Sequence, residues 1–140
     1  MSANFVHLRL HTEYSISDGT IRISQLVEAA RKDQMIALAV TDLSNLFAAV
    51  KFYRQARKAG IKPVIGADVW IISEFGLSRI LLLCRNQAGY LRLSELITQG
   101  YRSEQPQGKP AIDQQAFDQG DNTGLIALSG GREGEIAQYL

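Results

Sequence analysis

The sequence has little of several features that would assign it to a specialised class of protein. Cys84 is its only cysteine, so an intrachain disulfide cannot form, and this usage fits a reducing compartment. Lys and Arg number 15 against 14 Asp and Glu, so there is no overall basic field to attract nucleic acid. No apolar run is long enough to span a membrane, and residues 1–5 lack the charged start and apolar stretch of a signal peptide. We therefore expect a cytoplasmic protein without a disulfide framework or a membrane contact.

The composition that remains is that of an ordinary globular domain. The chain has 140 residues, of which 46% are hydrophobic and 21% are charged. That length suits one domain or part of a larger one.

Strand and helix patterns alternate along most of the chain. Short apolar or alternating runs predict strands, and apolar residues recurring every three or four positions predict helices. The expected strands cover residues 5–10, 36–41, 62–71, 79–84 and 125–128, and the expected helices cover residues 24–32, 45–59 and 86–98. Residues 103–122 are rich in Gln, Pro, Gly and Asp, which predicts a loop with one helical turn near residues 114–117.

Local signals set the ends and faces of these elements. Ser24 is a plausible N-cap, Gly60 and Gly100 are expected to end the second and third helices, and Gly66 is expected to interrupt a strand. The helical residues expected to face the core are Leu26, Val27, Ala30, Phe47, Val50 and Ala56.

This order of elements predicts an α/β fold with a mainly parallel sheet, either open and doubly wound or closed as a barrel. The first predicted strand turns His7, Arg9 and His11 to one side, whereas a central strand of an open sheet is apolar on both faces. A polar inner face suits the top of a barrel, but a complete (β/α) barrel takes roughly 250 residues. We expect a partial, distorted barrel that residues 1–140 do not complete.

The strongest chemical signal lies at the end of that first strand. Residues 7–15 read HLRLHTEYS, and Asp18 and Gly19 follow. Imidazoles two or four residues apart on a strand project to the same side, as a metal site requires, and Asp18 could add an oxygen ligand. For a single histidine, a hydrogen-bonded pocket at a polar strand end is the simpler interpretation.

The full string resembles the opening motif of the PHP (polymerase and histidinol phosphatase) domain in bacterial DNA polymerase III α subunits. The resemblance continues in order along nearly the whole chain. Its further blocks are AVTD at residues 39–42, NL at 45–46, KFY at 51–53, GIKPVIGAD at 60–68, NQAGY at 86–90 and LIALSG at 125–130.

The resemblance also identifies the positions of a metal site. His11 and Asp18 match the ligand pattern of metal-binding family members, and Asp68 stands where those members carry Glu. These three residues are the expected vestigial metal positions, and they could hold at most a weakly bound ion. The remaining ligands of the family come from later strands that this chain does not contain.

Three further ligand positions are substituted. Metal-binding members carry His where this chain has Arg9, Leu43 and Arg79. A guanidinium has no lone pair to donate and would repel a cation, and a leucine offers only hydrocarbon. Our hypothesis is that Arg9 and Arg79 replace the positive charge of the metal and pair with Asp18 and Asp68. The alternative is that both arginines reach solvent at the barrel mouth.

The resemblance implies a role in replication. The parent protein would be a DNA-directed DNA polymerase using Mg²⁺, and this segment would have no catalytic residue or cofactor of its own. It would act as a scaffold that supports the polymerase core and docks the proofreading exonuclease subunit, with other holoenzyme subunits and DNA reached through the parent protein. Two alternatives stay open: an active metal-dependent phosphoesterase or 3′–5′ exonuclease, and a free-standing, non-enzymatic binding module. An incomplete barrel also predicts self-association.

A cluster of basic residues lies on and just after the second predicted helix. Its members are Lys51, Arg54, Arg57, Lys58 and Lys62. A solvated helix face explains the cluster, and a nucleic-acid contact in the parent protein is the alternative.

Overall fold

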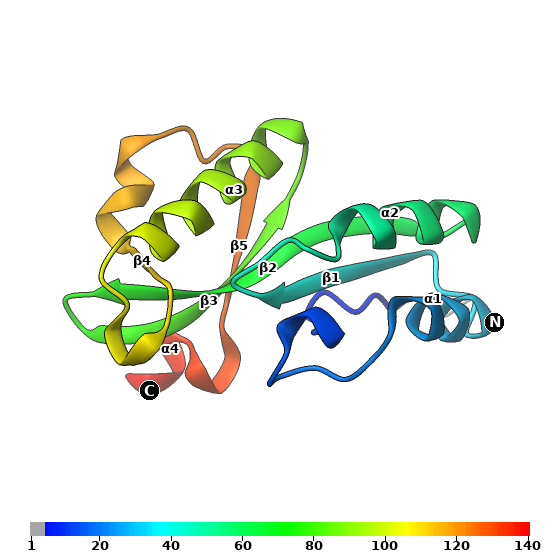
Figure 1. The fold of residues 1–140 in the computed structure, drawn as a ribbon, viewed down its shortest axis with the longest axis horizontal. Helices are drawn as coiled ribbons and strands as arrows, with labels where there is room; N and C mark the ends of the chain where they lie inside the picture. Colours follow the sequence, from blue (N-terminus) through cyan, green and yellow to red (C-terminus); the bar gives the residue numbers. More distant parts are fainter. Residues whose placement is uncertain (1–4) are drawn as a thin grey trace.

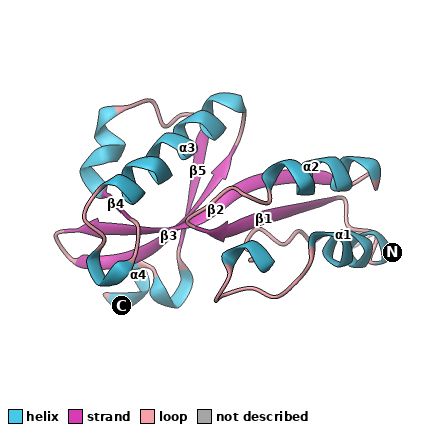
Figure 2. Cartoon of the chain, in the orientation of Figure 1, coloured by secondary structure: helices cyan, strands magenta, loops and turns pink. Residues whose placement is uncertain are grey.

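A mixed sheet forms the centre of the molecule, and helices lie above and below it in the view of Figures 1 and 2. The computed structural model describes residues 5–140. The strands are β1 (Ala37–Leu43), β2 (Lys62–Ser73), β3 (Gly76–Cys84), β4 (Ala111–Asp113) and β5 (Leu125–Ser129). The α-helices are α1 (Ile23–Lys32), α2 (Ala49–Lys58), α3 (Gln87–Arg102) and α4 (Glu135–Gln138). Short 3-10 helices are η1 (Glu13–Ser15), η2 (Pro106–Gly108), η3 (Gln114–Gln119) and η4 (Gly131–Glu133).

The α/β fold class is confirmed, but the sheet is less parallel than expected. Its order is β1-β2-β3-β5, with β4 pairing beside β2. β1 and β4 run parallel to β2, whereas β3 is antiparallel to both β2 and β5. Only two residues separate Ser73 from Gly76. A hairpin can close over so short a connection, whereas a parallel crossover needs a dozen residues or more.

The N-terminal segment lies along β1 without forming the predicted strand at residues 5–10. The backbone N–H of Ala39 donates to the carbonyl of His7 at 3.0 Å, and that of Thr41 donates to the carbonyl of Leu10 at 2.8 Å. The two acceptors are three residues apart and the two donors are two apart, so a regular ladder cannot form. The Thr41 hydroxyl takes the place of one backbone partner by accepting from the Leu10 N–H at 2.8 Å.

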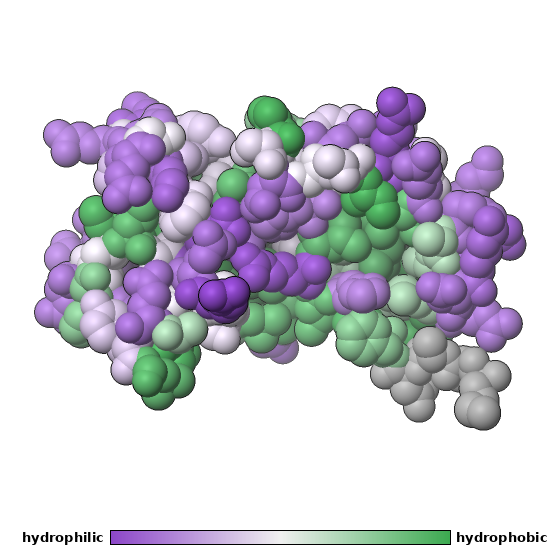
Figure 3. Space-filling view, turned by 90° about the horizontal axis from the view of Figure 1, so that it is seen from below, coloured by the Kyte–Doolittle hydropathy of each residue, from purple (hydrophilic) through white to green (hydrophobic). Residues whose placement is uncertain are grey.

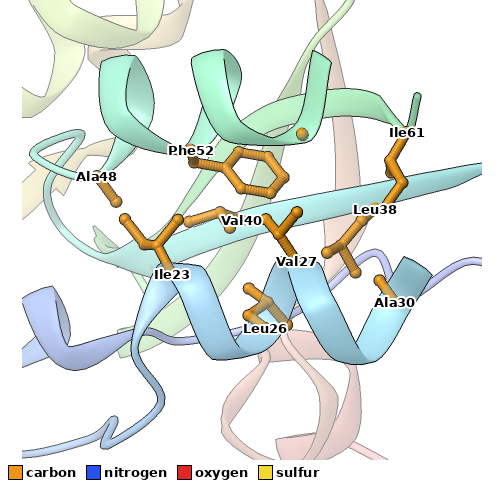
Figure 4. Close-up of a cluster of buried hydrophobic side chains, with 10 residues drawn as sticks. Ile23, Leu26, Val27, Ala30, Leu38, Val40, Ala48, Phe52 and Ile61 are labelled. Carbon is orange, nitrogen blue, oxygen red and sulfur yellow. The ribbon is translucent and has the colours of Figure 1, made fainter. Parts of the chain in front are cut away.

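One apolar cluster joins α1, β1 and α2, and Figure 4 shows its side chains pointing into a common interior. The predicted stripe of Leu26, Val27 and Ala30 is buried here, and Ile23 extends it by one turn. Phe52 from α2 is fully buried against them. Aromatic and branched side chains of this size each contribute about 2 kcal/mol when buried, so this cluster holds the N-terminal half together.

The core-facing residues predicted for α2 were partly wrong. Ala56 is buried as expected, but Phe47 and Val50 are 71% and 63% exposed. The buried face is instead Ala49, Phe52 and Ala56. α2 begins four residues later than the predicted start at residue 45, which leaves Phe47 in the preceding turn and changes which residues point inward.

The predicted element ends fit to different degrees. Ser24 lies inside the first turn of α1, whose N-cap is Arg22. Gly60 follows α2 with φ 77°, the left-handed conformation expected after a helix. α3 continues through Gly100, where a Cβ would lie 3.2 Å from the Pro110 carbonyl oxygen, so this glycine allows close packing instead of ending the helix. β2 likewise continues through Gly66.

The two faces of the sheet differ in character. A second apolar cluster beneath α3 includes Val69, Leu82 and Leu93 on the helix-covered face. On the other face, the register places Asp68 beside Leu43 of β1 and Leu81 of β3. A buried carboxylate therefore lies in the middle of the face that α3 does not cover. Within residues 5–140, no helix has the length and apolar character needed to cross a bilayer.

Candidate functional site

The predicted site residues gather in an open pocket on this second face. The pocket has a volume of about 450 Å³ and lies between the N-terminal segment, β3 and the turn after β5. In Figure 1 these segments meet on the lower side of the molecule. Seen from below in Figure 3, that side carries hydrophilic side chains across its middle. The residues that line the pocket are Arg9, Leu10, His11, Asp18, Arg79 and Glu133.

Asp68 is the buried centre of the cluster. Its Oδ2 accepts from Arg9 Nε at 2.8 Å and lies 2.7 Å from Arg9 Nη2, with His11 Nε2 at 3.0 Å. Its Oδ1 is buried without a hydrogen-bond partner among the described residues. Burial alone would raise the pKa of Asp68, but the hydrogen bonds from His11 and Arg9 leave that pKa lowered overall. The carboxyl group is therefore held as an anion.

His11 bridges the two predicted aspartates. Its Nδ1 lies 3.0 Å from Asp18 Oδ2, and its Nε2 lies 3.0 Å from Asp68 Oδ2. The hydrogen bond with Asp68 raises the pKa of His11, against the opposing effect of burial. With a carboxylate at each ring nitrogen, the imidazolium form can donate on both sides. When protonated, His11 is a third cation beside the two arginines.

Arg79 lies over an aromatic ring and reaches three carboxylates. Its Cζ is 4.6 Å from the ring centroid of Trp70, the residue opposite it in the β2–β3 register. Nη2 donates to Asp18 at 3.3 Å, and Nη1 lies 2.7 Å from Glu133 and 3.8 Å from Asp68. The ion pairs expected between the arginines and Asp18 and Asp68 are present, so neither arginine simply extends into solvent.

Glu133 is a member of the cluster that the sequence analysis missed. Besides its contact with Arg79, it lies 4.0 Å from Arg9 Nη2, and the Gly130 carbonyl accepts from Arg9 Nη1 at 3.4 Å. Three cations, counting a protonated His11, thus meet three carboxylates. The glycine-rich turn after β5, which carries Glu133, has no sequence motif that indicates a site. The predicted cluster, however, held two carboxylates for three possible cations, and this imbalance could have prompted a search for a third carboxylate.

Leu43 and His7 differ from the other residues considered for the site, because neither joins the ion pairs. Leu43 lies next to Asp68 in the register, as the predicted ligand position requires, and contributes only hydrocarbon there. His7 is exposed and contacts the ring of Phe5 edge-on at 4.7 Å, away from the pocket. The N-terminal segment is not a regular strand, so the predicted alternation of its side chains does not hold, and His7 does not join Arg9 and His11 in the pocket.

A second buried carboxylate fixes the loop that carries the cluster. Asp42 accepts from the Thr12 backbone N–H at 2.6 Å and from the Ser15 hydroxyl at 2.7 Å. The Leu43 N–H in turn donates to the Ser15 hydroxyl at 3.0 Å. Asp42 therefore ties the segment just after His11 to the end of β1, which positions His11 and Asp18 over the sheet. Thr12, Ser15 and Asp42 lie within the motifs that carry the resemblance, but no role was predicted for them.

The side chains of this pocket do not fit a cluster of metal ions. Among residues 5–140, no group of three or more His, Cys, Asp and Glu side chains is arranged to hold a metal ion. Both nitrogens of His11 face carboxylates, and the guanidinium of Arg9 covers Asp68 Oδ2. Arg79 adds a fixed positive charge beside the same groups, which disfavours a nearby divalent cation. That these positions are the remnant of a metal site stays a prediction.

Solved structures support the fold. A putative metal-dependent phosphoesterase from Bifidobacterium adolescentis is similar with a TM-score of 0.58 and 20% identity, over 71% of this chain and 34% of that one. An amidohydrolase from Chromobacterium violaceum, solved with bound SO₄ and no metal, gives a TM-score of 0.57 and 20% identity, over 69% and 33% of the two chains. The chain thus has the fold of part of these larger proteins, as expected for a partial barrel.

Sequence relatives are closer. DNA polymerase III subunit alpha of Pseudomonas fluorescens is 49% identical over 143 residues, and that of Escherichia coli K12 is 40% identical over 139 residues. These matches cover 100% and 97% of this chain but only 12% of each relative. The family model for the PHP domain matches residues 7–140. The chain belongs to the PHP domain family.

Proposed function

We propose that this chain is the N-terminal part of the PHP domain of a DNA polymerase III α subunit, and that it serves there as a non-catalytic scaffold. The similarity to such subunits along the whole chain supports the polymerase assignment. The parent protein would extend DNA with Mg²⁺ at carboxylates outside residues 1–140, in the cytoplasm with the chromosome. No catalytic residue or cofactor is assigned to this segment.

The observation that carries the scaffold role is the ion-pair cluster around Asp68. A metallohydrolase uses adjacent ions to activate water and to stabilise the leaving oxygen. Here Arg9, His11 and Arg79 already supply positive charge to Asp18, Asp68 and Glu133. Such charge-assisted contacts join the N-terminal segment, β2, β3 and the turn after β5 without a metal. The cluster therefore suits a domain that holds its shape and supports its neighbours, including the polymerase core and a proofreading exonuclease subunit.

Metal content and hydrolysis together test this proposal. The chain would be purified from cells grown with added Zn²⁺ and Mn²⁺, analysed for bound metal, and assayed with a phosphomonoester and with single-stranded DNA. We expect less than stoichiometric metal, no Mn²⁺-dependent turnover and no change in thermal stability on adding a chelator. Stoichiometric metal whose removal destabilises the protein and abolishes turnover would support the phosphoesterase alternative instead.

A ligand-restored variant provides the matched control. Arg9→His, Leu43→His, Asp68→Glu and Arg79→His together return the donors that the resemblance places at these positions. We expect this variant to gain metal binding relative to the unaltered chain, because each change replaces a cation or hydrocarbon with a lone-pair donor, or lengthens a carboxylate. Metal binding that is already full in the unaltered chain and unchanged in the variant would contradict the proposed role of the arginines.

A further inference from the structure

The outward face of α2 carries apolar side chains where a solvated helix would carry polar ones. Val50 and Tyr53, one helical turn apart on α2, are 63% and 51% exposed, and Phe47 in the turn just before α2 is 71% exposed. We call these residues, with Arg54 and the adjoining groove, the α2 surface. Single exposed apolar residues are common, but contiguous ones mark contact sites.

A groove of about 630 Å³ adjoins these side chains. Tyr53 and Val50 of α2 line one side, and Tyr90 from the first turn of α3 lines the other. Pro63 and Ile65 of β2 also line the groove. Figure 1 shows α2 and α3 above the sheet, whereas the N-terminal segment and the turn after β5, whose residues line the ion-pair pocket, lie on its lower side. The groove is thus mostly apolar, aromatic at its walls and separate from the candidate site.

The charges around this groove are all positive. Arg54 and Arg85 line it, and α2 contains four cations and no acidic residue. Within the described chain, neither arginine has a carboxylate within 4.0 Å, and the only side-chain hydrogen bond of Arg85 is a 3.4 Å contact to the Thr123 carbonyl. In the ion-pair cluster, by contrast, every arginine is matched by an internal carboxylate. The cations of the α2 surface are therefore available to an external anion.

We propose that the α2 surface docks a protein partner through a segment whose apolar anchor side chains are flanked by Asp or Glu. Aromatic residues and arginines together are typical of protein interfaces. A second copy of this chain would bring the same cations and repel them. A nucleic acid would satisfy the arginines, but it would leave Phe47 and Val50 without apolar contacts. This inference deepens the proposed scaffold role by giving the chemistry of one docking surface.

Fluorescence anisotropy with a designed peptide tests the docking surface. The probe is a fluorescein-labelled amphipathic helix with Leu and Phe at positions i, i+3, i+4 and i+7 and Glu elsewhere. We expect saturable binding to the chain, which Val50→Asp weakens about tenfold or more because it places a carboxylate among the apolar contacts. Arg54→Glu combined with Arg85→Glu is expected to weaken binding similarly and to increase the affinity for a peptide with Lys in place of Glu.

Matched controls separate the surface from general effects. Ile36→Asp alters a residue as exposed as Val50, and Arg102→Glu makes a single Arg-to-Glu change at the far end of α3, to be compared with Arg54→Glu alone; neither control should change binding. Equal binding of the lysine peptide, preference for oligothymidylate with no effect of Val50→Asp, or no saturable binding would each overturn the inference. Metal-dependent turnover with intact peptide binding would instead overturn only the scaffold role, so the two failures are distinguishable.

Discussion

Single residues at the candidate site show how a buried charge is tolerated without a metal. Asp68 is fully buried, and leaving such an anion unpaired would cost several kcal/mol, by general estimates about 3–5 kcal/mol when one partner of a buried pair is lost. Arg9 and His11 both donate to one of its oxygens, and Arg79 lies slightly farther away. The stability of this region therefore depends on the negative charge of Asp68 and the surrounding positive charges all being present together.

Removing the central charge should expose this dependence. Asp68→Asn keeps the size of the side chain but leaves Arg9, His11 and Arg79 facing one another around a neutral amide. We expect the free energy of unfolding to fall by about 3 kcal/mol, as for loss of one partner in a buried pair. Urea unfolding measures the change. The matched control is Glu28→Gln, which breaks an exposed pair with Arg31 and should leave unfolding unaltered; equal effects of the two substitutions would contradict the cluster's importance.

The same cluster predicts how stability varies with pH. Folding raises the pKa of His11, so its contribution is complete below the unfolded value of about 6.5 and is lost as pH rises through the folded value. Folding lowers the pKa of Asp68, so its contribution is complete above about 4 and is lost as pH falls through the folded value.

The cluster should therefore stabilise most between about pH 4 and pH 6.5. Urea unfolding in a series of buffers measures this profile. His11→Gln should remove the decline on the alkaline side, because glutamine does not titrate. A decline that persists unchanged in His11→Gln would assign it to another group.

Residue types predicted the site better than strand alternation did. Arg9, His11, Asp18, Asp68 and Arg79 come together as the motif and its substitutions indicated. The excess of cations pointed to a third carboxylate, but the sequence did not identify it as Glu133, because Glu133 approaches Arg79 only when the turn after β5 passes β3, a long-range consequence of the fold. His7 was misplaced because the Thr41 side chain interrupts the pairing that would have enforced alternation.

At the scale of elements, local sequence patterns predicted which segments are helices and which are central strands. The ends of these elements and the faces they bury depended on packing. The apolar stripe of α1 and the apolar runs of β1 and β3 predicted their type. The buried face of α2 could not be predicted in this way, because the exposed Phe47 and Val50 are as apolar as the buried Ala49 and Phe52. Local hydrophobicity cannot distinguish a face that packs internally from one left exposed.

The packing of α3 against a neighbouring loop gives a prediction at this scale. A Cβ at Gly89 would overlap the backbone carbonyl of Gly124, which cannot move as a flexible side chain can. Although Ala is normally favoured over Gly in a helix, we expect Gly89→Ala to destabilise the protein by about 2 kcal/mol, as overpacking does. The urea concentration at the unfolding midpoint should fall. Gln87→Ala, at an exposed position of the same turn, should leave this midpoint unchanged. A Gly89→Ala variant that is more stable than the unaltered chain would show that there is room for a methyl group beside the Gly124 carbonyl.

For the whole molecule, the open side of the sheet is the main feature. Within the described residues, β5 pairs only with β3, and Ile126 is exposed on the face that also carries Leu81 and Leu83. An open strand edge beside apolar side chains favours association between chains. Because the similar solved structures are about three times as long as their matched parts, such a surface fits a fold that continues beyond this sheet.

We therefore expect the chain to self-associate as its concentration rises. Sedimentation velocity should show a growing fraction of larger species. Ile126→Lys should reduce it, because lysine adds a charge next to the open edge of the sheet. Ile36→Lys, at an exposed site away from β5, should not. A single monomeric boundary at every concentration would contradict this expectation.

Trp70 gives the candidate site a built-in optical reporter. It is the only tryptophan of the chain, and its ring lies between the guanidinium of Arg79 and the ammonium of Lys109, whose Nζ is 4.0 Å from the ring centroid. Indole emission responds to nearby charge and to water. Any event that draws Arg79 away, such as protonation of its carboxylates or arrival of a competing anion, should therefore shift or dim the emission without an added label.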